Sequence, residues 1–349
     1  MAQSLNNKLL FYSRILFACY FFISSIGCVD TDKTSTDQTP VSSGFSIKGV
    51  SIVAPVKPID SSALQPMVDI NANSIVIMPY AFCSPENPVV RYNKKGQWWG
   101  ESGDGVISCI ELAHKNNLTV MLKPHLWIQH GMYTGAFVLK TDNDWKLWED
   151  SYRNYIVYFG NIADSMKAEM FCIGVELGMA IKERPQFWVS LIDTLRTIYH
   201  GKLTYAANWD DYQNFPFWEK LDYIGVDAYF PLDKNATPEI NSLKKGWKRY
   251  SDDLERISNE KQLQVLFTEY GYRNVDYSTA EPWKENEGKQ NDEAQSNAFE
   301  AFYQTFAEKK WFAGGFVWKW YLDNKPHHKI DFTPQDKTAA TVIKKWYRN

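Results

Sequence analysis

Residues 169–208 read EMFCIGVELGMAIKERPQFWVSLIDTLRTIYHGKLTYAAN and contain one complete copy of a pattern that recurs along the chain. Two short runs rich in β-branched and aromatic residues, Glu169–Glu176 and Lys202–Asn208, predict strands. Between them, the stretch Pro185–Tyr199 has the pattern of a helix. A strand, a helix and another strand in this order are typical of a repeated βα architecture with parallel strands.

The pattern repeats from residue 45 to the end of the sequence. Further helical patterns separate most of the strand-like runs, and they cover Gly105–Lys115, Trp145–Ala168, Thr237–Asn259 and Asn291–Lys309. Eight parallel strands with intervening helices close most simply into a ring. The sequence therefore predicts a single (β/α)8 barrel over residues 45–349. Its predicted strands are Phe45–Val53, Asn73–Tyr80, Leu118–His125, Glu169–Glu176, Lys202–Asn208, Leu221–Tyr229, Gln264–Tyr270 and Gly314–Trp320.

The last segment, Asp331–Asn349, predicts a closing helix that begins at Thr333-Pro334. Its residues Val342, Ile343 and Trp346 are expected to pack on the outside of the barrel. The loops after the second, third, sixth, seventh and eighth strands are rich in Pro, Gly and Trp. Such insertions belong on the C-terminal face of a barrel, where the functional site lies.

The charge of the chain excludes some classes of partner. The 349 residues include 38 Lys and Arg against 41 Asp and Glu, so a basic surface for nucleic acid is not expected. Beyond the N-terminal region, the cysteines are Cys83, Cys109 and Cys172, with no CxxC pair or zinc spacing. We expect buried cysteines, no metal, no cofactor and a monomer.

The N-terminus has the organisation of an export signal. Lys8 and Arg14 precede the apolar run Ile15–Ile26, which is too short to span a bilayer comfortably. The following Gly27-Cys28 resembles a bacterial lipobox, which predicts a lipoprotein signal peptide over residues 1–28 with lipid attached to Cys28. The polar residues 29–44 predict a flexible tether. The resemblance implies an exported cell-envelope lipoprotein, with the outer-membrane surface as one destination and lipid as the sole membrane contact; an uncleaved anchor or a plain signal peptide is the alternative.

Two glutamates end strands that should be buried. Glu176 closes the fourth predicted strand and Glu269 lies near the end of the seventh, so both belong to the C-terminal face. These strands occupy opposing arcs of an eight-strand ring, which lets the carboxylates converge. Paired carboxylates are what glycosidic-bond cleavage requires, and their separation decides between retention and inversion of configuration. Glutamates paired with Lys or Arg for purely structural reasons are the alternative.

Polar and aromatic residues accompany these glutamates at the other strand ends. Indole rings pack against the C–H face of a sugar, so tryptophans here are candidate sugar platforms. Alternation along the last strand places Trp318 and Trp320 on one face, with Trp320 as the preferred platform. The candidate substrate-binding residues are Lys123, His125, Trp127, Asn208, Trp209, Asp227, Tyr229, Trp318 and Trp320.

At these residues the sequence resembles the retaining glycoside hydrolases of clan A, and most closely glycoside hydrolase family 113. The matching segments are KPHLW at 123–127, GVELG at 174–178, FTEYGYR at 267–273, GGFVWKWY at 314–321 and DFTPQDKTAATVIKKWY at 331–347. Characterised members of this family are endo-β-1,4-mannanases. The resemblance therefore implies a double-displacement hydrolase of mannan-type polysaccharides, with Glu176 as general acid/base and Glu269 as nucleophile.

One position departs from the clan pattern. Most members carry Asn immediately before the acid/base, where it contacts the sugar 2-OH, whereas this chain has Val175. Asn208 or His125 is expected to make that contact instead. Tyr229 is the candidate for orienting Glu269, and Lys123 or Arg273 for keeping it ionised.

Two other functions remain open at this stage. An exo-acting β-mannosidase or another β-glycanase would use the same pair of carboxylates. A surface glycan-binding lipoprotein built on an inactive barrel would retain the aromatic residues without turnover.

The lipid attachment can be tested directly. We expect cells fed a radioactive or clickable palmitate to label the wild-type chain, and Cys28→Ala to abolish the label because the acceptor thiol is gone. Label that survives in Cys28→Ala would reject attachment at this residue.

Overall fold

The structure is a computed structural model that describes residues 46–284, 288–322 and 329–348. The predicted signal peptide, Cys28 and the tether lie outside the described residues, so those assignments stay predictions.

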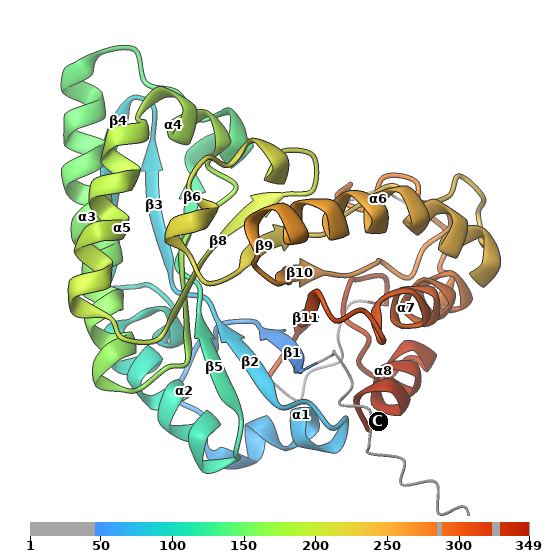
Figure 1. Ribbon diagram of the computed structural model, residues 1–349. Coiled ribbons are helices and arrows are strands. Elements are labelled where there is room, and N and C mark those ends of the chain that lie inside the picture. The colour runs from blue at the N-terminus through green and yellow to red at the C-terminus, as the bar shows by residue number, and fades with distance from the viewer. Residues whose placement is uncertain (1–45, 285–287, 323–328, 349) are drawn as a thin grey trace, which may run out of the picture. The chain divides into compact units, whose positions relative to one another are not determined.

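Eight parallel strands form a closed barrel, which confirms the predicted (β/α)8 fold (Figure 1). Around the ring the order is β1-β11-β10-β9-β8-β7-β5-β2, so sequence neighbours are also spatial neighbours. The barrel strands are β1 (Ile47–Ile52), β2 (Ser74–Ile77), β5 (Thr119–Leu122), β7 (Met170–Val175), β8 (Lys202–Asn208), β9 (Ile224–Asp227), β10 (Val265–Tyr270) and β11 (Phe312–Trp320).

Helices surround the barrel and follow the predicted pattern at most connections. The link from β8 to β9 differs, since it holds only short 3-10 turns at Tyr212–Asn214 and Trp218–Lys220. The helices are α1 (Gln65–Asp69), α2 (Gly103–Lys115), α3 (Asp142–Ser165), α4 (Gly178–Glu183), α5 (Pro185–Ile198), α6 (Ile240–Lys261), α7 (Asp292–Phe306) and α8 (Thr338–Arg348). Among the described residues, none of these helices is long and apolar enough to cross a membrane.

A second, three-stranded sheet extends the barrel wall beyond β2 and β5 (Figure 1). It consists of β3 (Tyr80–Ser84), β4 (Asn87–Arg91) and β6 (His125–Ile128) in the order β4-β3-β6. The sequence predicted unbroken strands ending at Tyr80 and His125. Instead, Pro79 and Pro124 interrupt both strands, because a proline has no N–H to donate to the ladder.

Most of the aromatic side chains form the layer between barrel and helices. The indoles of Trp148, Trp188, Trp218 and Trp247 are fully buried there. The barrel interior is lined by smaller or flexible side chains such as Met121, Met170 and Cys172, together with Phe316. The predicted burial of Cys83, Cys109 and Cys172 is confirmed, and all three are free thiols.

The C-terminal helix docks on the barrel as expected but begins later than predicted. α8 starts at Thr338 rather than at Thr333-Pro334, since residues before it form turns such as the Lys337 N–H to Pro334 C=O bond. Ile343 is buried, and Val342 and Trp346 pack against the same core. The Tyr347 hydroxyl donates to the Gly49 carbonyl at 2.8 Å, which ties the end of the chain to β1.

Candidate active site

A buried lysine connects three strand ends at the C-terminal mouth of the barrel. Lys123 directly follows β5, across the ring from β9 and β10, and its side chain is 0% exposed. Its Nζ lies 2.6 Å from Glu269 Oε1 and 2.9 Å from Asp227 Oδ1. Thr268 adds a 2.7 Å hydrogen bond from its hydroxyl to the same Asp227 oxygen. One ammonium therefore holds two carboxylates in place.

Electrostatics keep this lysine charged. Burial alone would lower the pKa of Lys123, but the charges of Asp227 and Glu269 outweigh it and raise the pKa above its ordinary value. Burying an unpaired ammonium costs several kcal/mol, and the ion pairs with these carboxylates offset that cost.

The second oxygen of Glu269 is fixed from the other side. The Tyr229 hydroxyl donates to Glu269 Oε2 at 2.8 Å, so each carboxylate oxygen has one strong donor. The predicted contacts of Glu269 with Tyr229 and with Lys123 are both present. The carboxylate has little rotational freedom, as a group that must attack along one line requires.

His125 adds a neutral imidazole next to this carboxylate. Its Nε2 lies 3.6 Å from Glu269 Oε1 and has no hydrogen-bond partner within the described part of the chain. Burial and the nearby Lys123 charge lower the pKa of His125 well below its ordinary value. The ring packs between Tyr80 and Trp318, at centroid distances of 5.1 and 6.3 Å. A sugar hydroxyl is a suitable hydrogen-bond partner for this unpaired ring nitrogen.

Glu176 faces a cavity rather than the core. It follows β7 with a positive φ of 51°, and its N–H donates to the Ala206 carbonyl at 2.8 Å. The half-buried side chain lines a cavity of about 720 Å³ together with Tyr133, Asn208 and Asp210. Within residues 46–284, 288–322 and 329–348, no side chain donates a hydrogen bond to the Glu176 carboxylate.

The two glutamates lie in different electrostatic surroundings. Burial, with the charges of Asp227 and Glu269 adding to it, raises the pKa of Glu176 well above its ordinary range. Burial and Asp227 also raise the pKa of Glu269, to about 7, but Lys123 and Tyr229 oppose that shift. The hydrogen bonds from Lys123 and Tyr229 therefore stabilise the ionised form of Glu269, whereas Glu176 has no such donor among the described residues. Two carboxyls in such different surroundings are suited to acid and carboxylate roles.

Some predicted substrate contacts occupy other positions. Lys123 and Asp227 are at most 1% exposed, and Lys123 is paired with both Asp227 and Glu269. Because both side chains are buried, neither contacts a substrate. Trp320 is 4% exposed and packs in the outer core layer, whereas half-buried Trp318 belongs to the barrel interior. A register shift in the pairing of β1 with β11 breaks the alternation between the two indoles. Trp318, not Trp320, is thus available as a sugar platform.

The remaining candidates lie around the mouth. Asn208 lines the larger cavity, where its side-chain amide donates to the Tyr133 hydroxyl. Trp127 is 52% exposed and lines a second cavity with Trp318. Trp209 stacks on Trp283 at a centroid distance of 5.1 Å. Tyr133 was missed in the sequence because it lies in an irregular loop with no strand-end signal.

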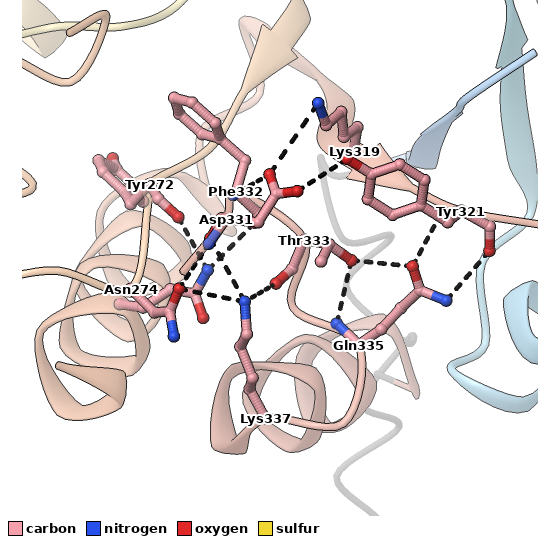
Figure 2. Close-up of polar contacts among 10 residues, drawn as sticks. Tyr272, Asn274, Lys319, Tyr321, Asp331, Phe332, Thr333, Gln335 and Lys337 are labelled. Atoms are coloured by element: carbon pink, nitrogen blue, oxygen red, sulfur yellow. Dashed lines mark hydrogen bonds and ion pairs between the residues drawn. The ribbon is translucent and has the colours of Figure 1, made fainter. Parts of the chain in front are cut away.

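The tail segment that begins at Asp331 makes polar contacts with Asn274 after β10 and with Tyr321 after β11 (Figure 2). Asp331 accepts a 2.7 Å hydrogen bond from the Tyr321 hydroxyl and lies 4.0 Å from Lys319 Nζ. Its N–H donates to Asn274 Oδ1 at 2.9 Å, and Lys337 Nζ donates to the same oxygen. These bonds tie the loop after β10 to the loop after β11, which follows Trp318 and Lys319.

Comparisons with known proteins agree with this architecture. The sequence profile described as Glycoside Hydrolase Family 113 matches residues 57–338. The β-mannanase of Alicyclobacillus acidocaldarius is 23% identical with a TM-score of 0.77, over 87% of this chain and 97% of that one. Another structure, named as a GH113 β-1,4-mannanase, is 23% identical with a TM-score of 0.75, over 87% and 99%. A Faecalibacterium prausnitzii β-glucuronidase is 14% identical with a TM-score of 0.59, over 87% and 49%. Among curated proteins, no relative matches the chain.

Removing the buried cation should destabilise the protein in a pH-dependent way. In Lys123→Met, Asp227 and Glu269 lose their counter-ion, so we expect a loss of about 3–5 kcal/mol in the free energy of unfolding near pH 8. Without Lys123 the pKa of folded Glu269 rises further above its ordinary value of 4.5. Because a raised carboxyl pKa favours the folded state only at low pH, the loss should shrink toward about pH 5.

Denaturant unfolding of the wild-type protein and of Lys123→Met, at about pH 8 and about pH 5, measures this loss of stability. Lys146→Met is the matched control, since Lys146 forms an exposed ion pair with Asp150 that contributes less than about 1 kcal/mol. A deficit in Lys123→Met that is equal at both pH values would reject the proposed charge coupling.

Proposed function

Because this chain belongs to glycoside hydrolase family 113, we propose that it hydrolyses β-1,4-mannosidic bonds in mannan-type polysaccharides with Glu269 as nucleophile and Glu176 as general acid/base. The observation that carries the assignment is the difference between the two carboxyls. Glu269 is held by Lys123 and Tyr229, whereas Glu176 opens into the larger cavity without such donors. A fixed carboxylate suits attack on carbon, and a protonated carboxyl facing the cleft suits donation to a leaving oxygen.

The first step consumes the proton on Glu176. Glu176 donates it to the glycosidic oxygen while Glu269 attacks the anomeric carbon, so the C–O bond to the leaving sugar breaks and a glycosyl ester forms. Glu269 thereby loses its negative charge. Lys123 remains neutralised by Asp227, to which it is also bonded at 2.9 Å. The ion pair with Asp227 keeps the ammonium in place when its other partner becomes an ester.

The second step uses the same groups in reverse. Esterification of Glu269 removes one of the charges that raise the pKa of Glu176, so the deprotonated form of Glu176 becomes more favourable. It then takes a proton from water, whose oxygen attacks the anomeric carbon and releases Glu269. Two inversions at one carbon leave the configuration retained.

His125 is the better candidate for the sugar 2-OH. The Asn208 amide already donates to Tyr133, and its Oδ1 accepts from the Trp209 N–H at 2.8 Å. His125 Nε2 is open and lies beside Glu269, where the reacting sugar must sit. Within the proposed mechanism, this neutral imidazole takes the place of the Asn that Val175 replaces.

The family match and the named relatives support mannan as the substrate. Three of the matching structures are named as β-mannanases. We also propose that a lipid anchor at Cys28 holds the enzyme at the cell envelope, which would give it access to polysaccharide outside the cytoplasm. That part rests on residues outside the described structure.

Hydrolysis assays with matched variants test the assignment. The wild-type protein should cleave β-mannan or its oligosaccharides, whereas cellulose and xylan serve as comparisons. Glu176→Gln should lower kcat by about 10²–10⁴-fold on these substrates, because general acid catalysis contributes about that much. The loss should be much smaller with a dinitrophenyl β-mannoside, whose leaving group needs no proton. Glu269→Gln should lose activity on both kinds of substrate.

Glu183→Gln, on the exposed face of α4, is the control and should retain wild-type activity. Binding of glycans without cleavage of any of them by the wild-type protein would favour a binding function instead. Full activity in Glu269→Gln would remove that residue from the mechanism.

A further inference from the structure

The Tyr229 side chain that holds Glu269 packs against a residue from the last part of the chain. The Phe332 ring lies edge to face with the Tyr229 ring, at a centroid distance of 6.1 Å and an angle of 74°. Phe332 is 8% exposed and lines neither of the two cavities at the mouth. It therefore contacts the group that supports the proposed nucleophile and stays out of the space that a substrate would occupy.

The backbone of Phe332 is fixed on both sides. Its N–H donates to Asp331 Oδ1 at 2.6 Å, and its carbonyl accepts a 3.1 Å hydrogen bond from Gln295 Nε2. Gln295 is buried on α7, and the same nitrogen donates to the Tyr272 carbonyl at 2.8 Å. The place of the Phe332 ring is thus set by α7 together with the loop after β10.

Asp331 ties the residue before this ring to two further segments (Figure 2). The Asp331 N–H donates to Asn274 Oδ1 at 2.9 Å, and the Asn274 N–H donates to the Asp331 carbonyl at 3.3 Å. Asn274 is fully buried in the loop after β10. The Tyr321 hydroxyl, just after β11, donates to Asp331 Oδ2 at 2.7 Å. These bonds leave the backbone at Asp331 little freedom to shift.

A half-buried lysine holds the residues on either side of Phe332 (Figure 2). Lys337 Nζ donates to the Thr333 carbonyl at 2.7 Å and to the Asp331 carbonyl at 3.3 Å. Thr333 is fully buried. Residues 331–333 therefore form a short, firmly bonded segment, and the Phe332 ring is the part of it that packs on Tyr229.

A tilt of the Tyr229 ring would move its hydroxyl away from Glu269. The hydroxyl lies at the far end of the side chain and donates to Glu269 Oε2 at 2.8 Å, so a small rotation of the ring displaces this donor most. Edge-to-face packing of two rings is favourable and directional, and it restricts such a rotation. Because the rate of a displacement depends steeply on the alignment of the reacting groups, a loosened donor would slow attack by Glu269.

We propose that Phe332 is a positioning residue for the hydrolysis, which keeps the Tyr229 hydroxyl on Glu269 and thereby holds the nucleophile in line with the anomeric carbon. The inference rests on the proposed function, since it requires Glu269 to attack carbon. It also gives the bonds around Asp331 a role in the reaction, because they fix the backbone from which the Phe332 ring reaches Tyr229.

Kinetics of Phe332→Leu test this role, since leucine keeps the position apolar but removes the ring edge. A dinitrophenyl β-mannoside is the substrate, because its leaving group needs no proton from Glu176 and kcat/KM then reports attack by Glu269. We expect kcat/KM to fall by about tenfold or more, because misplaced catalytic groups are costly.

A double-mutant cycle with Tyr229→Phe separates positioning from a general loss of structure. Tyr229→Phe removes the hydroxyl through which Phe332 acts. Adding Phe332→Leu to Tyr229→Phe should therefore lower kcat/KM by less than about twofold further, as expected for coupled residues. Equal losses from Phe332→Leu in the wild-type and Tyr229→Phe backgrounds would overturn the inference and leave the proposed hydrolysis intact.

The pH profile supplies a readout that a purely structural role would not move. Burial and Asp227 raise the pKa of Glu269, whereas Lys123 and the Tyr229 hydrogen bond lower it. A loosened Tyr229 raises that pKa, so the acidic limb of kcat/KM should move to higher pH in Phe332→Leu. An acidic limb that stays in place would count against the inference. The variant leaves unchanged the other titratable groups that act on Glu269 or are affected by its charge, which are Tyr80, His125 and Glu176.

Phe306→Leu is the matched control. Phe306 is fully buried on α7 and packs against Trp311 and Phe312 at the start of β11, at the end of the barrel opposite the mouth. The same substitution is made there without a contact to Tyr229, so kcat/KM and the acidic limb should stay at their wild-type values. A loss in Phe306→Leu as large as in Phe332→Leu would overturn the positioning role.

A second variant keeps the test decisive if Phe332→Leu does not fold. Phe332→Met fills the site with a flexible apolar side chain and is taken through the same cycle, with the same expected outcomes. Absence of turnover of the dinitrophenyl β-mannoside and of β-mannan oligosaccharides by the wild-type protein would contradict the proposed function itself, and this inference with it.

Discussion

The buried ion pairs of Lys123 are the constraint on which the functional end of this barrel depends. An ammonium that is 0% exposed is tolerable only with close opposite charges, and here Asp227 and Glu269 lie 2.9 and 2.6 Å away. The three residues come from strand ends on opposite sides of the ring. Closure of the barrel is therefore what brings the charges together, and the charges in turn require the strand ends to lie at matching heights. Stability and the position of the proposed nucleophile are set by the same contact.

The closed barrel also separates the aromatic residues into a buried layer and a group at the barrel mouth. Large rings fill the layer between strands and helices, where Trp148, Trp188, Trp218 and Trp247 are fully buried. The rings left at the mouth belong to the second sheet and the neighbouring loops, as with Trp98 and Trp127. Two cavities result, one lined by Glu176 and one by Glu101.

The sequence was sufficient to predict the barrel and the positions of Glu176 and Glu269 at strand ends, because each signal is local. A buried run that ends in Glu176 or Glu269 marks a strand end without knowledge of the rest of the fold. Other features depend on pairing between distant strands. The second sheet was missed because Pro79 and Pro124 break what reads as continuous strand, and Trp320 was wrongly favoured because a register shift against β1 turns it into the core. Lys123 was correctly linked to Glu269, but its complete burial, which excludes substrate contact, becomes visible only when the ring is closed.

The most direct test of the account is to identify the residue that carries the sugar during turnover. A 2-deoxy-2-fluoro-β-mannosyl fluoride reacts through its good leaving group, and the fluorine slows release of the glycosyl ester so that it accumulates. Digestion and mass spectrometry of the inactivated protein should then place one fluoromannosyl group on Glu269. Label on Glu176 or on any other residue, or turnover of this reagent with inversion and no label, would contradict the assignment of Glu269 as the nucleophile.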